Sequence, residues 1–244
     1  MKLQTTLLLS TLALSSAAFA QTKAPEPDYT LSYNAGVVSD YRYRGISQSR
    51  LEPAVQGGID FAHKNGFYLG AWGSTIKWIK DAGAKGNVEL DLYGGYKGEL
   101  AKDLSYDLGV LRYEYLNNTL SPNANTTEVY GALTFGVFTA KYSQSLTNLF
   151  GTANSKNSTY LDLSANFDLG SGMTLTPHVG RQEVKHAASS SYTDYSLTLA
   201  KDLGKGLSFT IAAVSTDADK TVYKTPANKF TGKSAAVVGL KYSF

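Results

Sequence analysis

The regular alternation of short turns and long loops along this 244-residue chain constrains its fold more than any other feature. Asn-Gly and Gly-x-Gly sequences supply the positive φ angles that tight β-turns require. Such turns occur at His63–Gly66, Ala101–Asp103, Gly136, Gly170–Gly172 and Gly204–Gly206, and they alternate with longer polar connections such as 80–86, 117–126, 147–158 and 217–232. This order predicts a series of hairpins with the tight turns at one end and the long loops at the other.

The segments between these connections place apolar residues at every second position, which predicts β-strands with one apolar face. In residues 159–169, for example, Leu161, Leu163 and Phe167 alternate with Asp162 and Ser164. Twelve such runs cover residues 29–48, 54–62, 67–79, 87–100, 104–116, 127–135, 137–146, 159–169, 173–183, 192–203, 207–216 and 233–244. The first run is longer than a membrane crossing needs, so we expect it to project beyond the bilayer or to bend at Gly36 or Gly45.

Residues 1–20 have the pattern of a signal peptide that directs export and is then removed. Lys2 supplies the positive end, Leu7–Leu9 belong to the apolar middle, and Ala18-Phe19-Ala20 forms a small-x-small cleavage signal. We expect residues 21–28, which contain Pro25 and Pro27, to be a disordered lead-in. The folded domain is therefore predicted to span residues 29–244.

The last predicted strand carries Leu240, Tyr242 and Phe244 on one face. An aromatic residue at the end of an apolar row is typical of the strand that closes an outer-membrane barrel, where interfacial aromatic rings meet the lipid headgroups. We expect these three residues to close the barrel and to be recognised by the barrel-assembly machinery.

Alternation alone does not distinguish a soluble β-sandwich from a membrane barrel, because the two differ only in which face meets the solvent. The signal peptide, the turn asymmetry and the final aromatic residue together favour a barrel. The prediction is an all-β, closed, up-and-down antiparallel transmembrane β-barrel of twelve strands in a bacterial (Gram-negative) outer membrane, with its apolar face against lipid. Closure is required because lipid offers no partner to an unpaired backbone group.

Composition excludes several other classes of function. The chain has no cysteine, and its three histidines, at 63, 178 and 186, have no common metal-binding spacing. A formal charge of +3 is too close to balance to indicate nucleic-acid binding. We therefore predict no metal, no cofactor and no nucleic-acid partner.

The segment Gly36–Gln48, with the sequence GVVSDYRYRGISQ, resembles the start of the TorF family of porins, whose members carry a similar SDYxxRGxSQ stretch after a signal peptide. The similarity continues through residues 53–58, 66–74 and 89–96 and weakens after about Tyr115. The resemblance implies an outer-membrane channel and assigns no binding residue.

A twelve-stranded barrel lies between eight strands, which side chains fill, and sixteen, which leave a wide pore. On the first run, Ser32, Asn34, Asp40, Arg42 and Arg44 share the predicted inner face, and Tyr29, Leu31, Tyr33, Tyr41 and Tyr43 the outer one. The residues predicted to line the lumen are Arg42, Arg44 and Lys233 on a basic wall, with Glu89, Asp91, Asp162 and Asp194 on acidic walls. Such walls create a transverse field in a narrow, charged lumen that passes small polar or charged solutes by passive diffusion. The alternative is that these charges pair across the lumen as a structural plug.

Two other functions stay open at this stage. One is a barrel-embedded hydrolase, for which His178 is a candidate base, although no nucleophile elbow occurs, and we predict no catalytic residue and no enzyme activity. The other is a non-conducting structural or adhesive barrel that works through its loops. Trp72 and Trp78 suggest sugar stacking, but aromatic residues at the membrane interface are the commoner use of tryptophan in barrels.

Overall fold

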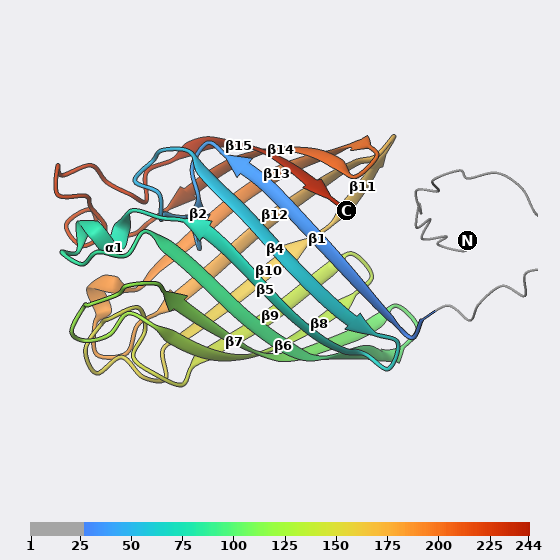
Figure 1. The fold of residues 1–244 in the computed structure, drawn as a ribbon, viewed down its shortest axis with the longest axis horizontal. Helices are drawn as coiled ribbons and strands as arrows, with labels where there is room; N and C mark the ends of the chain where they lie inside the picture. Colours follow the sequence, from blue (N-terminus) through green and yellow to red (C-terminus); the bar gives the residue numbers. More distant parts are fainter. Residues whose placement is uncertain (1–26) are drawn as a thin grey trace, which may run out of the picture.

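Antiparallel strands close into a barrel in the computed structural model, which describes residues 27–244 (Figure 1). The predicted signal peptide and all but the last two residues of the predicted lead-in lie outside the described residues. The strands of the wall are β1 (Tyr29–Val38), β4 (Ala54–His63), β5 (Phe67–Thr75), β6 (Val88–Ala101), β7 (Leu104–Tyr115), β8 (Thr126–Phe135), β9 (Phe138–Ser145), β10 (Thr159–Ala165), β11 (Phe167–Gly170), β12 (Met173–Glu183), β13 (Tyr192–Gly204), β14 (Leu207–Thr216) and β15 (Ala235–Ser243).

Twelve crossings result because β10 and β11 both pair with β12 and form one strand interrupted at Asn166. The ring closes between β1 and β15, from Asn34 opposite Ser243 to Val38 opposite Gly239. Beyond this ladder, the Phe244 amide donates to the Tyr33 carbonyl at 3.0 Å, and the Tyr33 amide donates to the Phe244 carbonyl at 2.8 Å. The predicted strand number and the predicted closing strand are confirmed.

The two ends of the barrel differ as the turn sequences predict. The tight turns lie on one side, together with the start of β1 and the end of β15, and the long loops lie on the other (Figure 1). Gly66 and Gly206 have φ angles of 100° and 81°, which residues other than glycine rarely adopt. The long-loop end also carries the only helical turns among residues 27–244, α1 (Trp78–Asp81) and the 3₁₀ turn η1 (Ala188–Ser190). None of the helices in this part of the chain is long and apolar enough to cross a membrane.

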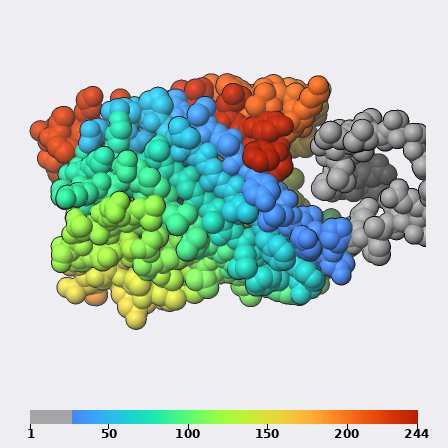
Figure 2. Space-filling view, viewed as in Figure 1, coloured from blue at the N-terminus to red at the C-terminus, as the bar shows by residue number. Residues whose placement is uncertain are grey.

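The outer face of the barrel is apolar. Its strands pack into a continuous wall (Figure 2). Large side chains that alternate along the strands are 40–60% exposed here, for example Leu69 at 50% and Leu163 at 44%. A soluble protein rarely exposes so continuous an apolar surface to water, whereas a barrel in a bilayer needs one to contact the lipid chains. The row includes Leu31, Val37, Leu69, Leu92, Leu108, Val110, Leu133, Leu161, Leu163, Leu197, Ile211 and Leu240.

Aromatic rings of Phe and Tyr gather near the tight-turn end of this outer face. Tyr33 stacks on Phe244 at a centroid distance of 5.7 Å, and Tyr29 stacks on Phe61 at 5.6 Å. The two tryptophans do not belong to this girdle, so the preference for an interfacial role was wrong. Trp72 packs edge-on against Tyr41 at 5.4 Å, and Trp78 packs against Tyr115 at 4.9 Å, both in a buried cluster inside the barrel.

Two predicted strands end early. The run 67–79 stops at Thr75, because the chain turns into α1 and the amides of Lys77 and Trp78 donate to the Gln48 carbonyl at 2.8 and 3.2 Å. The wall part of the run 29–48 stops at Val38 and does not bend at Gly36, but the chain turns at Gly45, the second position predicted for a bend. Residues 39–53 leave the wall and fold inward, and this inserted segment determines the architecture of the lumen.

Candidate functional site

A short hairpin inside the barrel mouth is formed by β2 (Arg42–Tyr43) and β3 (Ile46–Ser47). Arg42 lies opposite Ser47 and Tyr43 opposite Ile46. The two turn residues, Arg44 and Gly45, both have positive φ, at 45° and 77°, as a type I′ turn requires. An arginine in this conformation is strained, and such strain concentrates where a side chain must be held in one place.

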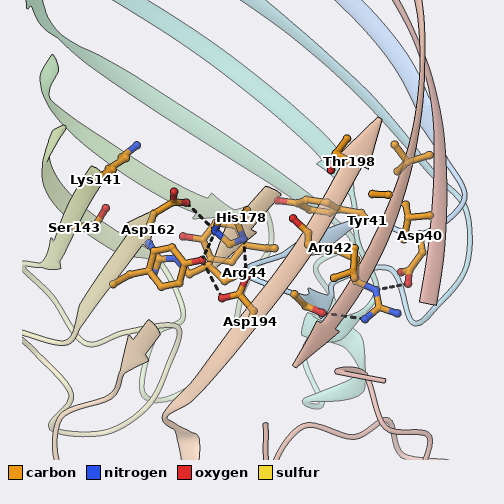
Figure 3. A pocket seen from close by; sticks show the side chains of 18 of the residues that line it. Asp40, Tyr41, Arg42, Arg44, Lys141, Ser143, Asp162, His178, Asp194 and Thr198 are labelled. Atoms are coloured by element: carbon orange, nitrogen blue, oxygen red, sulfur yellow. Dashed lines mark hydrogen bonds and ion pairs between the residues drawn. The ribbon is translucent and has the colours of Figure 1, made fainter. Parts of the chain in front are cut away.

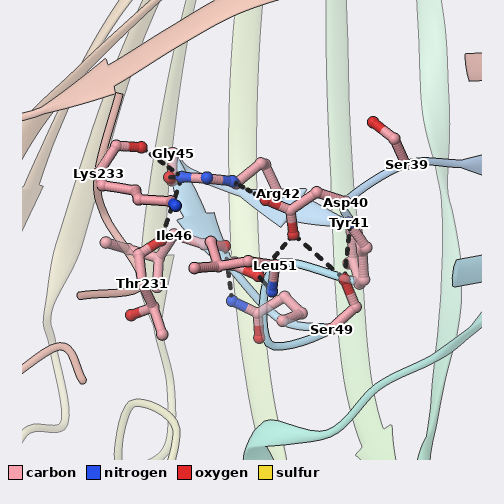
Figure 4. Close-up of polar contacts among 12 residues, drawn as sticks. Ser39, Asp40, Tyr41, Arg42, Gly45, Ile46, Ser49, Leu51, Thr231 and Lys233 are labelled. Carbon is pink, nitrogen blue, oxygen red and sulfur yellow. Dashed lines mark hydrogen bonds and ion pairs between the residues drawn. The ribbon is translucent and has the colours of Figure 1, made fainter. Parts of the chain in front are cut away.

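Asp40 organises the base of this hairpin (Figure 4). Its carboxylate accepts hydrogen bonds from Ser47 Oγ at 2.5 Å and Ser49 Oγ at 3.2 Å, and it pairs with Arg42 Nε at 2.5 Å. Arg42 Nη1 then donates to the backbone carbonyls of Gly45, Thr231 and Lys233 at 2.9, 3.1 and 3.1 Å. The Asp40–Arg42 pair therefore ties the hairpin to the chain just before β15.

Arg44 carries the tip of the hairpin across the lumen. Its guanidinium makes a bidentate ion pair with Glu128 on β8, at 2.6 and 3.1 Å, and Nη1 donates to Gln182 on β12 at 2.6 Å. The rings of Tyr160 and Tyr43 lie 4.2 and 4.8 Å from the guanidinium carbon. Since β8 and β12 lie on the far side of the ring from β1, the hairpin and this side chain together connect two sides of the barrel.

The hairpin divides the lumen into two cavities that share Tyr43. The inner cavity, of about 560 Å³, lies against the hairpin and the strands (Figure 3). Its polar wall includes Lys141, Ser143, Asp162, His178, Asp194, Ser196 and Thr198. The outer cavity, of about 570 Å³, opens among the long loops and is lined by aromatic residues that include Trp78, Tyr115, Phe150, Tyr192 and Tyr223.

His178 is the centre of a polar cluster in the inner cavity, where it lies between two carboxylates (Figure 3). Its Nε2 lies 3.0 Å from Asp162 Oδ2, and its Nδ1 lies 3.6 Å from Asp194 Oδ1. The Tyr160 hydroxyl donates to Asp194 Oδ2 at 2.9 Å and lies 3.2 Å from His178 Nε2. A hydrolytic triad needs one imidazole nitrogen free to accept a serine proton. Both nitrogens of His178 instead face carboxylates, which gives no support to a hydrolase.

On the other side of the lumen, the Tyr41 hydroxyl donates to Glu89 Oε1 at 2.8 Å. Glu89 is 1% exposed, and its Oε2 has no hydrogen-bond partner among the described residues; the same holds for Oδ1 of Asp91, the next inward residue on β6. In the outer cavity, burial raises the pKa of the Tyr223 hydroxyl, which donates to the Ser190 carbonyl at 2.5 Å. Both tyrosines thus act as neutral donors.

The predicted lumen residues can now be placed. Glu89, Asp91, Asp162 and Asp194 face the interior from β6, β10 and β13, as the alternation predicts. Arg42 and Arg44 also lie inside, but they reach the lumen from the hairpin and not from the wall. Lys233 precedes β15, is exposed, and contributes its carbonyl oxygen to Arg42.

Two expectations about this region need correction. Tyr41 and Tyr43 were predicted to face lipid, but they lie inside because the chain leaves the wall after Val38. The basic wall is also not observed, since Arg42 pairs with Asp40 and Arg44 with Glu128. Sequence reasoning missed Glu128 and Gln182, although both occupy inward positions of predicted strands and alternation identifies them as inward.

Solved structures with a similar fold are porins. The chain superimposes on KdgM porin in complex with disordered oligogalacturonate with a TM-score of 0.56 and 10% identity, covering 88% of this chain and 98% of that one. It matches a structure of NanC porin with a TM-score of 0.56 and 13% identity, covering 88% and 99%. At these identities the similarity shows the fold alone. A search of the curated proteins found no match.

Sequence similarity defines the family more directly than the fold does. A family model described as "Bacterial protein of unknown function (Gcw_chp)" matches residues 22–244, which include the whole barrel and the inserted hairpin. The chain therefore belongs to the Gcw_chp family.

Proposed function

We propose that this protein is a non-enzymatic outer-membrane channel that lets small polar solutes diffuse through a narrow, charged lumen. The observation that carries the proposal is the pair of cavities of about 560 and 570 Å³ on the two sides of the inserted hairpin. A barrel filled by its own side chains would have no such space, and a structural barrel has no need of a polar one. The porin fold of the solved relatives is consistent with this reading.

The apolar outer face, the girdle of Phe and Tyr, and the segment Gly36–Gln48 that resembles the TorF family support location in a bacterial outer membrane. Residues 1–20 would direct export, and the β15 row of Leu240, Tyr242 and Phe244 would be read by the barrel-assembly machinery. The TorF assignment is a finer proposal than membership of Gcw_chp, and it rests on that segment.

The hairpin has a defined role in this proposal, because it forms the constriction between the two cavities. Arg44 anchors its tip to the far wall, and Asp40 with Arg42 anchors its base. A solute must pass beside these pairs. The lumen is therefore selective by size first, and its permeability depends on how firmly the hairpin is held.

The barrel geometry suggests a direct test. Val38 and Ala54 are paired neighbours on β1 and β4, so residues 39–53 can be replaced by a two-residue Asn-Gly turn that keeps the two strands paired. The wall loses only the two hydrogen bonds between Ser39 and Val238. We expect the parent protein to form small channels in planar bilayers and the shortened variant to form larger ones. Liposome swelling with sugars of increasing size gives the matching cut-off for each protein.

A matched control removes exposed residues that line neither cavity, such as 121–123 at the tip of the loop between β7 and β8, and keeps the buried Ala124 in place. That variant should retain the parent conductance. Absence of conductance from both the parent and the hairpin-replacement variant, in samples shown to be folded by heat-modifiable mobility on gels, would refute the channel function.

A further inference from the structure

The charge that remains in the lumen after its ion pairs are counted has a definite sign. Arg42 and Arg44 both lie inside the barrel, but each is neutralised by a carboxylate. Arg42 Nε lies 2.5 Å from Asp40 Oδ2, and Arg44 Nη2 lies 2.6 Å from Glu128 Oε2. The side chains in these two pairs are 3–9% exposed, so they present little net field to a passing ion. The field in the pore is therefore set by the residues outside these pairs.

Inward carboxylates outnumber inward lysines in this remainder: Asp60, Asp107, Asp162 and Asp194 stand against Lys97, Lys141 and Lys241. Tyrosines hold the first two of these carboxylates in place. Tyr93 donates to Asp60 Oδ1 at 2.5 Å, and Tyr68 donates to Asp107 Oδ1 at 2.5 Å. Neither aspartate has an ion-pair partner within 4.0 Å among residues 27–244. A neutral hydroxyl fixes a carboxylate in place without cancelling its charge, whereas an arginine would cancel it. Each of these tyrosine–carboxylate pairs therefore keeps a full negative charge in the lumen.

The acids lie on both sides of the pore. Asp60 and Asp107 project from β4 and β7, while Asp162 and Asp194 project from β10 and β13 across the ring. His178 is shared by the second pair, so that cluster keeps one negative charge even when the imidazole is protonated. Lys141 is the one cation of the inner cavity that has no ion pair among the described residues.

Lys141 also shows how this lumen accommodates a cation. Its ammonium lies 3.8 Å from the centroid of the Tyr130 ring. The Tyr130 hydroxyl is hydrogen-bonded to the Tyr68 hydroxyl, which in turn donates to the Asp107 carboxylate. Lys97 lies 5.6 Å over the Tyr68 ring in the same chain of contacts. Aromatic faces attract cations through their quadrupole, and the carboxylate behind the ring strengthens that attraction.

We propose that the lumen selects cations over anions and binds small organic ammonium ions on its tyrosine faces beside Asp60 and Asp107. This inference rests on the proposed channel function and names its solute class. Rings of acidic side chains favour cations in channels, and low-dielectric walls focus the field of the few charges present. Neutral sugars and carboxylate solutes would gain nothing from this lining.

Reversal potentials in a potassium chloride gradient across a planar bilayer test the selectivity. We expect K⁺ to be about fivefold more permeant than Cl⁻, a ratio equivalent to about 1 kcal/mol. Spermidine, as an ammonium probe, should reduce the K⁺ current, whereas citrate at the same concentration should not. Both effects should weaken at high salt, since the charges act through water.

Two sets of variants move the ratio in opposite directions. Asp60→Asn with Asp107→Asn keeps oxygens that accept the tyrosine hydrogen bonds but removes two charges, and should lower the K⁺/Cl⁻ ratio at least about threefold and abolish spermidine block. Lys141→Gln should raise the ratio. Glu114→Gln is the matched control, because Glu114 lies on β7 at an outward position and pairs with Arg112 away from the lumen.

The outcomes separate the two proposals. Currents that favour Cl⁻, or a ratio unchanged in both the aspartate and the lysine variants, would overturn cation selectivity and leave the channel function intact. Absence of any current in folded protein would overturn the channel function itself, and the selectivity with it. Misfolding of the double aspartate variant leaves the Lys141→Gln measurement as the deciding one.

Discussion

Arg44→Ala offers the sharpest test of how the hairpin is held. The substitution removes the bidentate pair with Glu128, the bond to Gln182 and the stacking on Tyr160. It also leaves Glu128, whose side chain is 3% exposed, with only the Tyr113 hydroxyl at 3.2 Å as a donor. Breaking a buried ion pair by removing one partner costs about 3–5 kcal/mol.

That full cost need not appear in global unfolding, because the hairpin can detach while the barrel wall remains. Local opening caps the loss at the free energy that holds the hairpin in place. We therefore expect two signatures together. Urea unfolding in lipid vesicles should show a loss below about 3 kcal/mol, and single-channel conductance should rise toward that of the hairpin-replacement variant.

Two other variants calibrate this result. Arg44→Lys keeps the charge but loses the bidentate geometry and part of the ring stacking, so its conductance should lie between parent and alanine. Arg112→Ala removes an arginine whose pair with Glu114 is 36–37% exposed on the outer face, where such pairs are worth about 0–1 kcal/mol. Equal conductance and equal stability for Arg44→Ala and Arg112→Ala would show that Arg44 does not hold the hairpin.

Three further predictions concern the wall. A Cβ at Gly180 would collide with the Tyr160 hydroxyl, so Gly180→Ala should displace that ring. We expect a loss of about 1–3 kcal/mol in the free energy of unfolding in vesicles and a rise in conductance like that of Arg44→Ala. Wild-type stability and wild-type conductance would contradict this packing. Leu163→Arg puts a charge on the lipid face and should cost about 2–4 kcal/mol, measured by urea titration in vesicles, with a loss below that of an alanine substitution counting against lipid contact. Phe244→Ala removes the stacking on Tyr33. It should slow assembly into vesicles more when the barrel-assembly machinery is present than when it is absent. Equal slowing with and without the machinery would assign Phe244 to packing alone.

The amino-acid sequence determined the barrel wall almost completely. The order of the strands, the face on which each side chain lies, and the difference between the tight-turn end and the long-loop end all follow from local properties. Side chains alternate with a period of two, and turn glycines such as Gly66 adopt positive φ. Alternation also assigned Glu89 and Asp162 to the inner face, because a one-residue slip would have placed charge in lipid.

Only the tertiary structure decided what fills the lumen. The inserted hairpin alternates like a wall strand, and a lumen that is both polar and aromatic accepts either of its faces, so the sequence pattern could not show that the chain leaves the wall after Val38. The contacts that hold Arg44 join residues 84 and 138 positions apart, and no local pattern encodes such a distance. They exist because closing the ring brings β8 and β12 within reach of one side chain. That closure pairs Arg44 with Glu128, whereas Arg42 is already paired with Asp40 inside the hairpin.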